Sequence, residues 1–182
     1  MLPNEKLIDV LYFTAYTYWN NDRKKRHSNY VLINENRGCK VILGKFQEKD
    51  RFSAVKCFNP CALKAATGYC GKKFITHEEK MTDVNIAIGI LKTCIMGACD
   101  AIYLISGDND LVPALETVKE LFPKVRIRVI FPVNAKAKNL MNICQKNGFR
   151  YQRLKEHHLA SSQFPNPVVI GGNSYPKPVH WI

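Results

Sequence analysis

The sequence predicts an α/β fold with a mostly parallel sheet, and three observations support this. Short apolar runs rich in β-branched and aromatic residues alternate with amphipathic segments of ten or more residues, which is typical of βαβ units. The 182 residues suffice for one domain, or for one domain with a small insert. With 46% of its residues hydrophobic, the chain can bury a core. We therefore expect parallel strands with helices on both faces of the sheet.

Two strands are expected in the first half of the chain. The apolar runs Leu7–Thr14 and Cys39–Phe46 have the composition of strands. Between them, the basic stretch 20–27 is either a loop or the start of a helix, and a short helix is expected over Ser28–Asn36. Residues 47–77 are mostly polar, contain three cysteines and a histidine, and are predicted to be an insert on the main scaffold.

The second half begins with a capping-box pattern, in which Thr76 is the N-cap and Glu79 follows three residues later. This pattern predicts a helix from Thr76 to about Met96, with an apolar stripe along one side. The elements expected after it are a strand over Ala101–Ile105, a helix over Leu111–Phe122, a strand over Val125–Phe131, a helix over Asn134–Asn147 that ends at Gly148, and a strand over Phe149–Leu154.

The chain is expected to divide into a main domain and a short tail. After Gln163 the sequence is rich in proline, glycine and asparagine, which is typical of an extended surface segment. The boundaries that follow are 1–160 for the domain and 161–182 for the tail.

The net charge indicates a polyanionic partner. The chain has 27 Lys and Arg against 15 Asp and Glu, a formal charge of +12, and both halves are basic. Nucleic acid is the commonest partner of such a chain, and a merely soluble basic surface is the alternative. No apolar run is long enough to span a membrane and no signal sequence precedes the first strand. Seven cysteines, an odd number, favour reduced thiols and a cytoplasmic location.

Two aspartates follow the strand expected over Ala101–Ile105. Function in parallel α/β sheets gathers at the carboxyl ends of the strands, which is where Asp108 and Asp110 fall. An N-cap role for Asp110 and a turn role for Asp108 would explain each residue alone. Neither role explains why two carboxylates that repel each other lie so close together. A divalent cation bound between them would relieve this repulsion.

Asp83 is the third candidate acid. It falls inside the helix expected after Thr76 and borders that helix's apolar stripe, where a carboxylate needs a partner or a metal ion. An ion pair with Lys80 is an equally good explanation. Together, Asp83, Asp108 and Asp110 could hold Mg²⁺ or Mn²⁺ and activate a water molecule against a phosphodiester.

Two segments around these acids resemble the signature segments of NYN domains, which belong to the PIN-like nuclease superfamily. The segments are 78–87 (EEKMTDVNIA) and 106–113 (SGDNDLVP), and the resemblance is to the LabA-like branch. It implies a three-layer PIN-like α/β/α sandwich and metal-dependent cleavage of RNA. Asp83, Asp108 and Asp110 would then be metal-site acids, and Ser106 and Asn85 would orient the phosphate or the acids.

The resemblance also implies a strand that this chain lacks. The family opens with a central strand that ends in an Ile-Asp-Gly-x-Asn segment, whose aspartate is the first metal-site acid, and Tyr12–Ala15 matches the second strand. Asp9 is not a substitute, because it sits near the start of its strand. We therefore expect impaired activity and sheet edges without partners.

A zinc site is expected in the insert. Cys57, Cys61, Cys70 and His77 offer four suitable ligands within 21 residues, although the spacing is not that of a standard knuckle. Relatives in the LabA-like branch carry a cysteine pair in the same region, which supports this hypothesis. The alternative is three unrelated thiols and a helix-capping histidine.

Basic side chains near the expected strand ends are candidate contacts for RNA. Phosphate binding is predicted for Lys45, Lys80, Lys136 and Lys138, which flank the carboxyl edge of the sheet. The leading hypothesis is a metal-dependent endoribonuclease that uses Mg²⁺ or Mn²⁺ and acts on RNA in the cytoplasm. The alternatives are a non-catalytic RNA-binding or regulatory module with a PIN-like fold, and a hydrolase of small phosphate esters.

Overall fold

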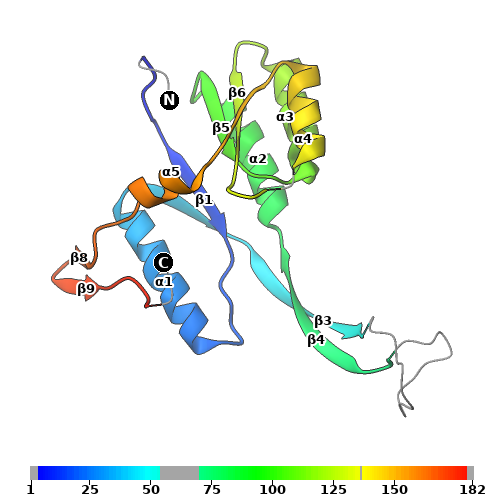
Figure 1. The fold of residues 1–182 in the computed structure, drawn as a ribbon. Coiled ribbons are helices and arrows are strands. Elements are labelled where there is room, and N and C mark those ends of the chain that lie inside the picture. Colours follow the sequence, from blue (N-terminus) through cyan, green and yellow to red (C-terminus); the bar gives the residue numbers. More distant parts are fainter. Residues whose placement is uncertain (1–3, 54–69, 136, 180–182) are drawn as a thin grey trace.

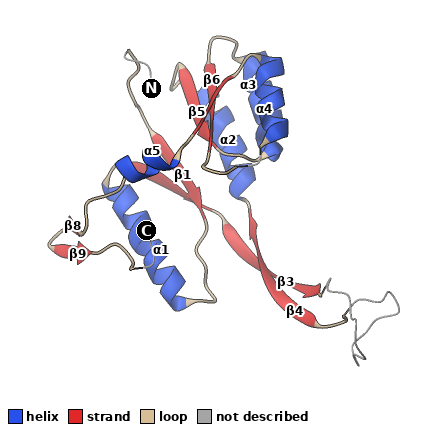
Figure 2. Cartoon of the chain, in the orientation of Figure 1, coloured by secondary structure: helices blue, strands red, loops and turns tan. Residues whose placement is uncertain are grey.

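The structure is a mixed α/β arrangement in which a long β-ribbon projects from a body of helices and strands (Figures 1 and 2). It is a computed structural model that describes residues 4–53, 70–135 and 137–179. The elements in chain order are β1 (Val10–Thr14), α1 (Asn21–Asn36), β2 (Cys39–Leu43), β3 (Lys45–Phe52), β4 (Lys73–Lys80), α2 (Thr82–Ile95), β5 (Ala101–Ile105), the 3-10 turn η1 (Asn109–Leu111), α3 (Val112–Leu121), β6 (Arg126–Phe131), α4 (Lys138–Asn147), β7 (Arg150–Arg153), α5 (Glu156–Ser161), β8 (Val168–Ile170) and β9 (Asn173–Tyr175).

The parallel strands form two separate sheets. β1 pairs with β2, and β5, β6 and β7 pair in that order, all in parallel. Within the described residues no strand lies between β1 and β5, so each of them has one edge without a strand partner. Helix α2 links the two sheets, because its Gly89 lies against the Phe13 ring of β1 while its Ile90 enters the core beside β5.

The main core lies between the β5–β6–β7 sheet and helices α2, α3 and α4 (Figure 1). Alternate residues of β6 face it, as period-two strand geometry requires, and the intervening residues face the other way. Side chains with essentially no exposed surface form its centre: Leu111, Leu115, Val118, Val129, Phe131, Leu140 and Cys144. This core holds the turn after β5 in place.

The helix expected from Thr76 is wrong in its first turn. Residues 73–80 form β4, which pairs antiparallel with β3 over eight residues, and α2 begins only at Thr82. Glu78 forms ion pairs with Lys49 (3.3 Å), Arg51 and Lys80 (3.1 Å), and these contacts favour the strand. Met81 then turns the chain into the helix with a φ of 76°. The capping-box spacing at Thr76 was therefore coincidental.

Most of the other predicted elements differ from the observed ones only at their ends. The basic stretch is the start of a helix, because α1 begins at Asn21 and the Asn20 side chain accepts a hydrogen bond from the Arg23 amide (2.8 Å). The strand expected over Cys39–Phe46 is interrupted at Gly44, where β2 ends and the ribbon begins. Gly148 ends α4 in the left-handed conformation, as predicted.

The C-terminal residues contain regular structure of their own. β8 and β9 form a small antiparallel hairpin after α5, and Val168 of β8 is buried beside α1. The ring of Phe164 lies edge-on to that of Tyr30 on α1, at 6.2 Å between centroids. In the described part of the chain no helix has the length and apolar character needed to cross a bilayer.

Candidate functional site

The turn after β5 carries the first part of the candidate site. Asp108 precedes η1, and its Oδ1 accepts a hydrogen bond from the Asp110 amide (2.9 Å). The Ser106 hydroxyl accepts a hydrogen bond from the Asp108 amide (3.1 Å). Ser106 thus fixes the turn that presents both aspartates. The capping role that the alternative explanation gave to Asp110 belongs to Asp108, which caps η1.

Helix α2 brings Asp83 to the same corner. Asp83 lies in the first turn of α2, where the helix dipole favours a negative charge. Two residues later, the Asn85 side-chain amide donates a hydrogen bond to the carbonyl of Leu43 at the end of β2 (3.4 Å). Asn85 therefore anchors this helix turn to the neighbouring sheet.

The acids interact through their charges. Burial raises the pKa of Asp83, and the negative charges of Asp108 and Asp110 raise it further. Glu79 acts on the Asp83 pKa in the same direction, and Glu79 also accepts a hydrogen bond from the Thr82 hydroxyl. The structure thus groups the three predicted aspartates and adds Glu79. The capping-box pattern assigns Glu79 to a helix cap, whereas its proximity to the aspartates arises only at the β4–α2 junction.

The donor chemistry at this corner suits a hard divalent cation. Mg²⁺ and Mn²⁺ prefer carboxylate oxygens, and Asp83, Asp108, Asp110 and Glu79 supply them. Among the described residues, however, no three His, Cys, Asp or Glu side chains converge closely enough to ligate one ion. The carboxylates lie close enough to influence one another electrostatically without surrounding a common point.

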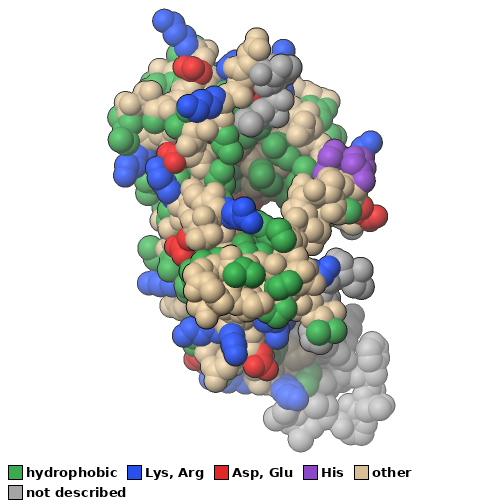
Figure 3. Space-filling model, turned by 90° about the vertical axis from the view of Figure 1, so that its left-hand side faces the viewer, with side chains coloured by type: hydrophobic (Ala, Val, Ile, Leu, Met, Phe, Trp, Pro, Cys, Tyr) green, Lys and Arg blue, Asp and Glu red, His purple; other side chains and the backbone are tan. Residues whose placement is uncertain are grey.

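Two of the predicted phosphate-binding lysines face each other at the base of the ribbon. Lys45 begins β3 and is the register partner of Lys80, which ends β4, directly before α2. Lys80 contacts Glu78 (3.1 Å). Lys138 is exposed at the first residue of α4, and Lys136 lies outside the described residues. Elsewhere, Lys and Arg side chains are spread over the face shown in Figure 3, with fewer acidic groups between them.

His77, a predicted zinc ligand, sits in an aromatic cluster instead of at a helix start. Its ring stacks on Trp19 (3.6 Å between centroids, 16° between planes), and Nε2 lies 3.5 Å from a Glu48 oxygen. Phe46 and Tyr18 meet the Trp19 ring edge-on at 4.9 and 5.2 Å. Cys70 lies before β4, and the other two predicted ligands, Cys57 and Cys61, lie outside the described residues.

Asp9 lies away from the acidic corner. It precedes β1 and forms an exposed ion pair with Lys40 (2.7 Å) at the amino end of β2. Asp108 instead follows the carboxyl end of β5, a strand of the other sheet. The placement agrees with the exclusion of Asp9 from the site.

Parallel strands that alternate with helices define an α/β protein. The model of the NYN domain family matches residues 6–150, and the chain belongs to this family. The match confirms the family named from the two acidic segments and covers most of the chain.

A curated relative is similar to part of the chain. This is 6-hydroxy-3-succinoylpyridine 3-monooxygenase HspA of Pseudomonas putida (strain DSM 28022 / S16), 28% identical over 105 residues. The match covers 57% of this chain and 33% of that protein, so the chain spans about a third of the relative's length. No solved structure matches the chain.

Proposed function

We propose that this chain is a metal-dependent ribonuclease of the NYN type, in which Asp83, Asp108 and Asp110 hold Mg²⁺ or Mn²⁺. The observation that supports this is the contact between α2 and the turn after β5, in which the charges of Asp108 and Asp110 act on Asp83 of the helix. Family membership supports a nuclease-like chemistry, and the formal charge of +12 favours a polyanionic substrate. The LabA-like branch and the three-layer PIN-like sandwich are part of the proposal.

Each group has a role in this scheme. The cation, when bound, would supply charge stabilisation for the phosphate and lower the pKa of a water molecule. Asp108 and Asp110 provide negative charge from the turn that Ser106 fixes, and Asp83 provides it from α2. Lys45, Lys80 and Lys138 orient the RNA backbone, as would Lys136. Glu79 adds a fourth carboxylate, whose negative charge increases the repulsion that a bound cation would relieve.

The test compares cleavage and binding of a labelled single-stranded RNA by the full chain. Cleavage should require Mg²⁺ or Mn²⁺ and stop in EDTA. Asp108→Asn should lower the cleavage rate by about 100-fold or more, the scale of removing a group that stabilises developing charge, and leave RNA affinity nearly unchanged. Asp100→Asn, the same change at the opposite end of β5, is the matched control and should cleave normally.

The outcomes separate the proposal from its rival. If RNA is bound but neither wild type nor variants cut it with any divalent metal, the chain is a non-catalytic RNA-binding module. The non-catalytic alternative is favoured by one observation: among the described residues, the carboxylates do not converge on a common point. Undiminished cleavage in EDTA would refute the metal assignment.

The zinc hypothesis has its own measurement. Elemental analysis of freshly purified protein should find about one zinc per chain, and a Cys57→Ser/Cys61→Ser variant should lose it. His77→Ala tests the histidine separately, because its ring is already stacked on Trp19. Zinc retained in the His77 variant would remove the histidine from the ligand set.

A further inference from the structure

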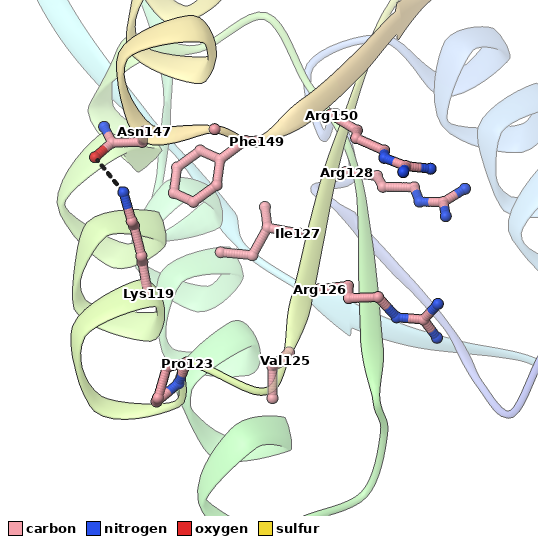
Figure 4. A pocket seen from close by; sticks show the side chains of 10 residues that line it. Lys119, Pro123, Val125, Arg126, Ile127, Arg128, Asn147, Phe149 and Arg150 are labelled. Atoms are coloured by element: carbon pink, nitrogen blue, oxygen red, sulfur yellow. Dashed lines mark hydrogen bonds between the residues drawn. The ribbon is translucent and has the colours of Figure 1, made fainter.

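Three arginines project from one face of the β6–β7 strand pair. Figure 4 shows the guanidinium groups of Arg126, Arg128 and Arg150 in a column on one side of β6, away from Lys119 and Asn147 on the other. Arg126 and Arg128 are two residues apart on the same strand, and Arg150 is the register partner of Arg128 on β7. We call these three residues the arginine column.

The arginine column carries an electrostatic penalty. Like charges side by side on neighbouring strands destabilise a sheet, and Arg128 and Arg150 are in that arrangement. In the described part of the chain Arg150 forms no ion pair, and the carboxylate that neutralises the other two belongs to Glu5 alone. The column therefore keeps more positive charge than the fold neutralises.

Glu5 occupies a built anion site. One of its oxygens lies 3.3 Å from Arg126 Nη1 and 3.2 Å from Arg128 Nη2, and the other accepts a hydrogen bond from the Tyr103 hydroxyl. The guanidinium of Arg128 also lies over the Tyr103 ring, 5.1 Å from its centroid. The Glu5 side chain is 9% exposed although residues 5–9 form no helix or strand. The three arginines also contribute, together with Lys119, to the lining of a hollow of about 410 Å³.

We propose that the arginine column is a second RNA contact, in which phosphodiester groups bind the guanidiniums and replace Glu5. Two guanidiniums and a hydroxyl directed at one carboxylate also suit a phosphate, which accepts hydrogen bonds from arginine in the same forked way. The column is separate from the acidic corner, because Arg126 pairs in register with Ala101 at the amino end of β5 and Asp108 follows the carboxyl end. This proposal names a binding surface for the substrate in "Proposed function" and depends on that function only for the identity of the polyanion.

The experiment measures binding of a labelled single-stranded RNA in EDTA over a range of salt concentrations. An Arg126→Ala/Arg150→Ala variant should bind about tenfold or more weakly. The slope of log affinity against log salt should fall by about 1.4, or about 0.7 for each lost phosphate contact. Glu5→Gln should tighten binding several-fold, because a competing negative charge is removed. Lys92→Ala/Lys146→Ala, which removes two exposed charges elsewhere, should leave the slope unchanged.

The results distinguish this inference from the proposed function. An arginine variant that melts like wild type and keeps the wild-type salt slope would overturn the inference, whatever the cleavage assay gives. A lower slope in a protein that never cleaves RNA would uphold it and reject the nuclease. Should Arg126→Ala/Arg150→Ala unfold, Arg150→Ala alone, which leaves the Glu5 contacts intact, must still lower the slope by about 0.7. If polyglutamate of equal charge competes better than RNA, the column serves an acidic protein and the RNA assignment is wrong.

Discussion

Gly44 should control the position of Asp83, and Gly44→Ala tests this. A Cβ at Gly44 would lie 2.5 Å from the Thr82 hydroxyl and 2.8 Å from the Lys80 carbonyl oxygen, whereas ordinary contacts begin near 3.4 Å. The strand end and the start of α2 must then separate by roughly 0.6 Å at the carbonyl. Because Thr82 directly precedes Asp83, the shift reaches the candidate site.

The expected size of the effect follows from this overpacking. Forcing a methyl group against backbone costs about 1–3 kcal/mol. For a chain of this length that corresponds to a fall in melting temperature of about 2–12 °C. Since a misplacement of about 1 Å can lower a rate 100-fold, cleavage should fall by about 10- to 100-fold. Thermal melting and the metal-dependent RNA cleavage assay measure the two effects.

Two further variants serve as controls for this prediction. At Gly107 an added Cβ meets only ordinary contacts, the nearest being the Ala135 Cβ at 3.4 Å. The free energy of unfolding of Gly107→Ala should therefore lie within about 1 kcal/mol of the wild-type value. Combining Gly44→Ala with Thr82→Ala should recover part of the lost stability, because one of the two clashes is removed. A Gly44→Ala protein with wild-type melting and full cleavage would show that the close approach at this crossing does not position Asp83.

Three further perturbations have definite expected outcomes. Leu115→Ala, at a side chain with no exposed surface, should lower the free energy of unfolding in urea by about 2–5 kcal/mol. The Arg51 and Lys80 contacts lower the pKa of Glu78 from 4.5 to about 2, so this carboxylate stabilises the ribbon above pH 4.5 and the contribution disappears as the pH falls through 2. Hydrogen exchange of the β3 and β4 amides should show that loss in wild type and not in Glu78→Gln. The pKa of Asp83 is raised, so its ionised form destabilises the fold at a pH above the raised pKa and has no such effect below the ordinary pKa of an aspartate. At pH 7 in EDTA, Asp83→Asn should therefore raise the melting temperature slightly, which corresponds to a gain of under about 1 kcal/mol in the free energy of unfolding. A lower melting temperature would contradict the repulsion.

Much of the fold could be predicted from the sequence because its signals are local. The strand expected over Ala101–Ile105 matches β5, since a short apolar run between turn residues has few alternatives. The helix expected over Leu111–Phe122 became η1 and α3 with its apolar stripe in the core, because amphipathic periodicity is a property of neighbouring residues. The position of Asp108 and Asp110 directly after β5 could be predicted for the same reason, because it is visible in the chain itself.

What only the tertiary structure decided depends on partners distant in sequence. Residues 76–80 satisfy a helix cap locally, yet they form β4 because pairing with β3 and the Glu78–Arg51 contact outweigh that preference. Glu79 joins the acidic corner only through that strand. The arginine column requires β6 and β7 to align and Glu5 to contact residues 121 and 123 positions away. A sequence pattern reports only on residues that are close together in the chain. The energy of strand pairing and of ion pairs depends instead on distant residues that become neighbours only in the folded protein.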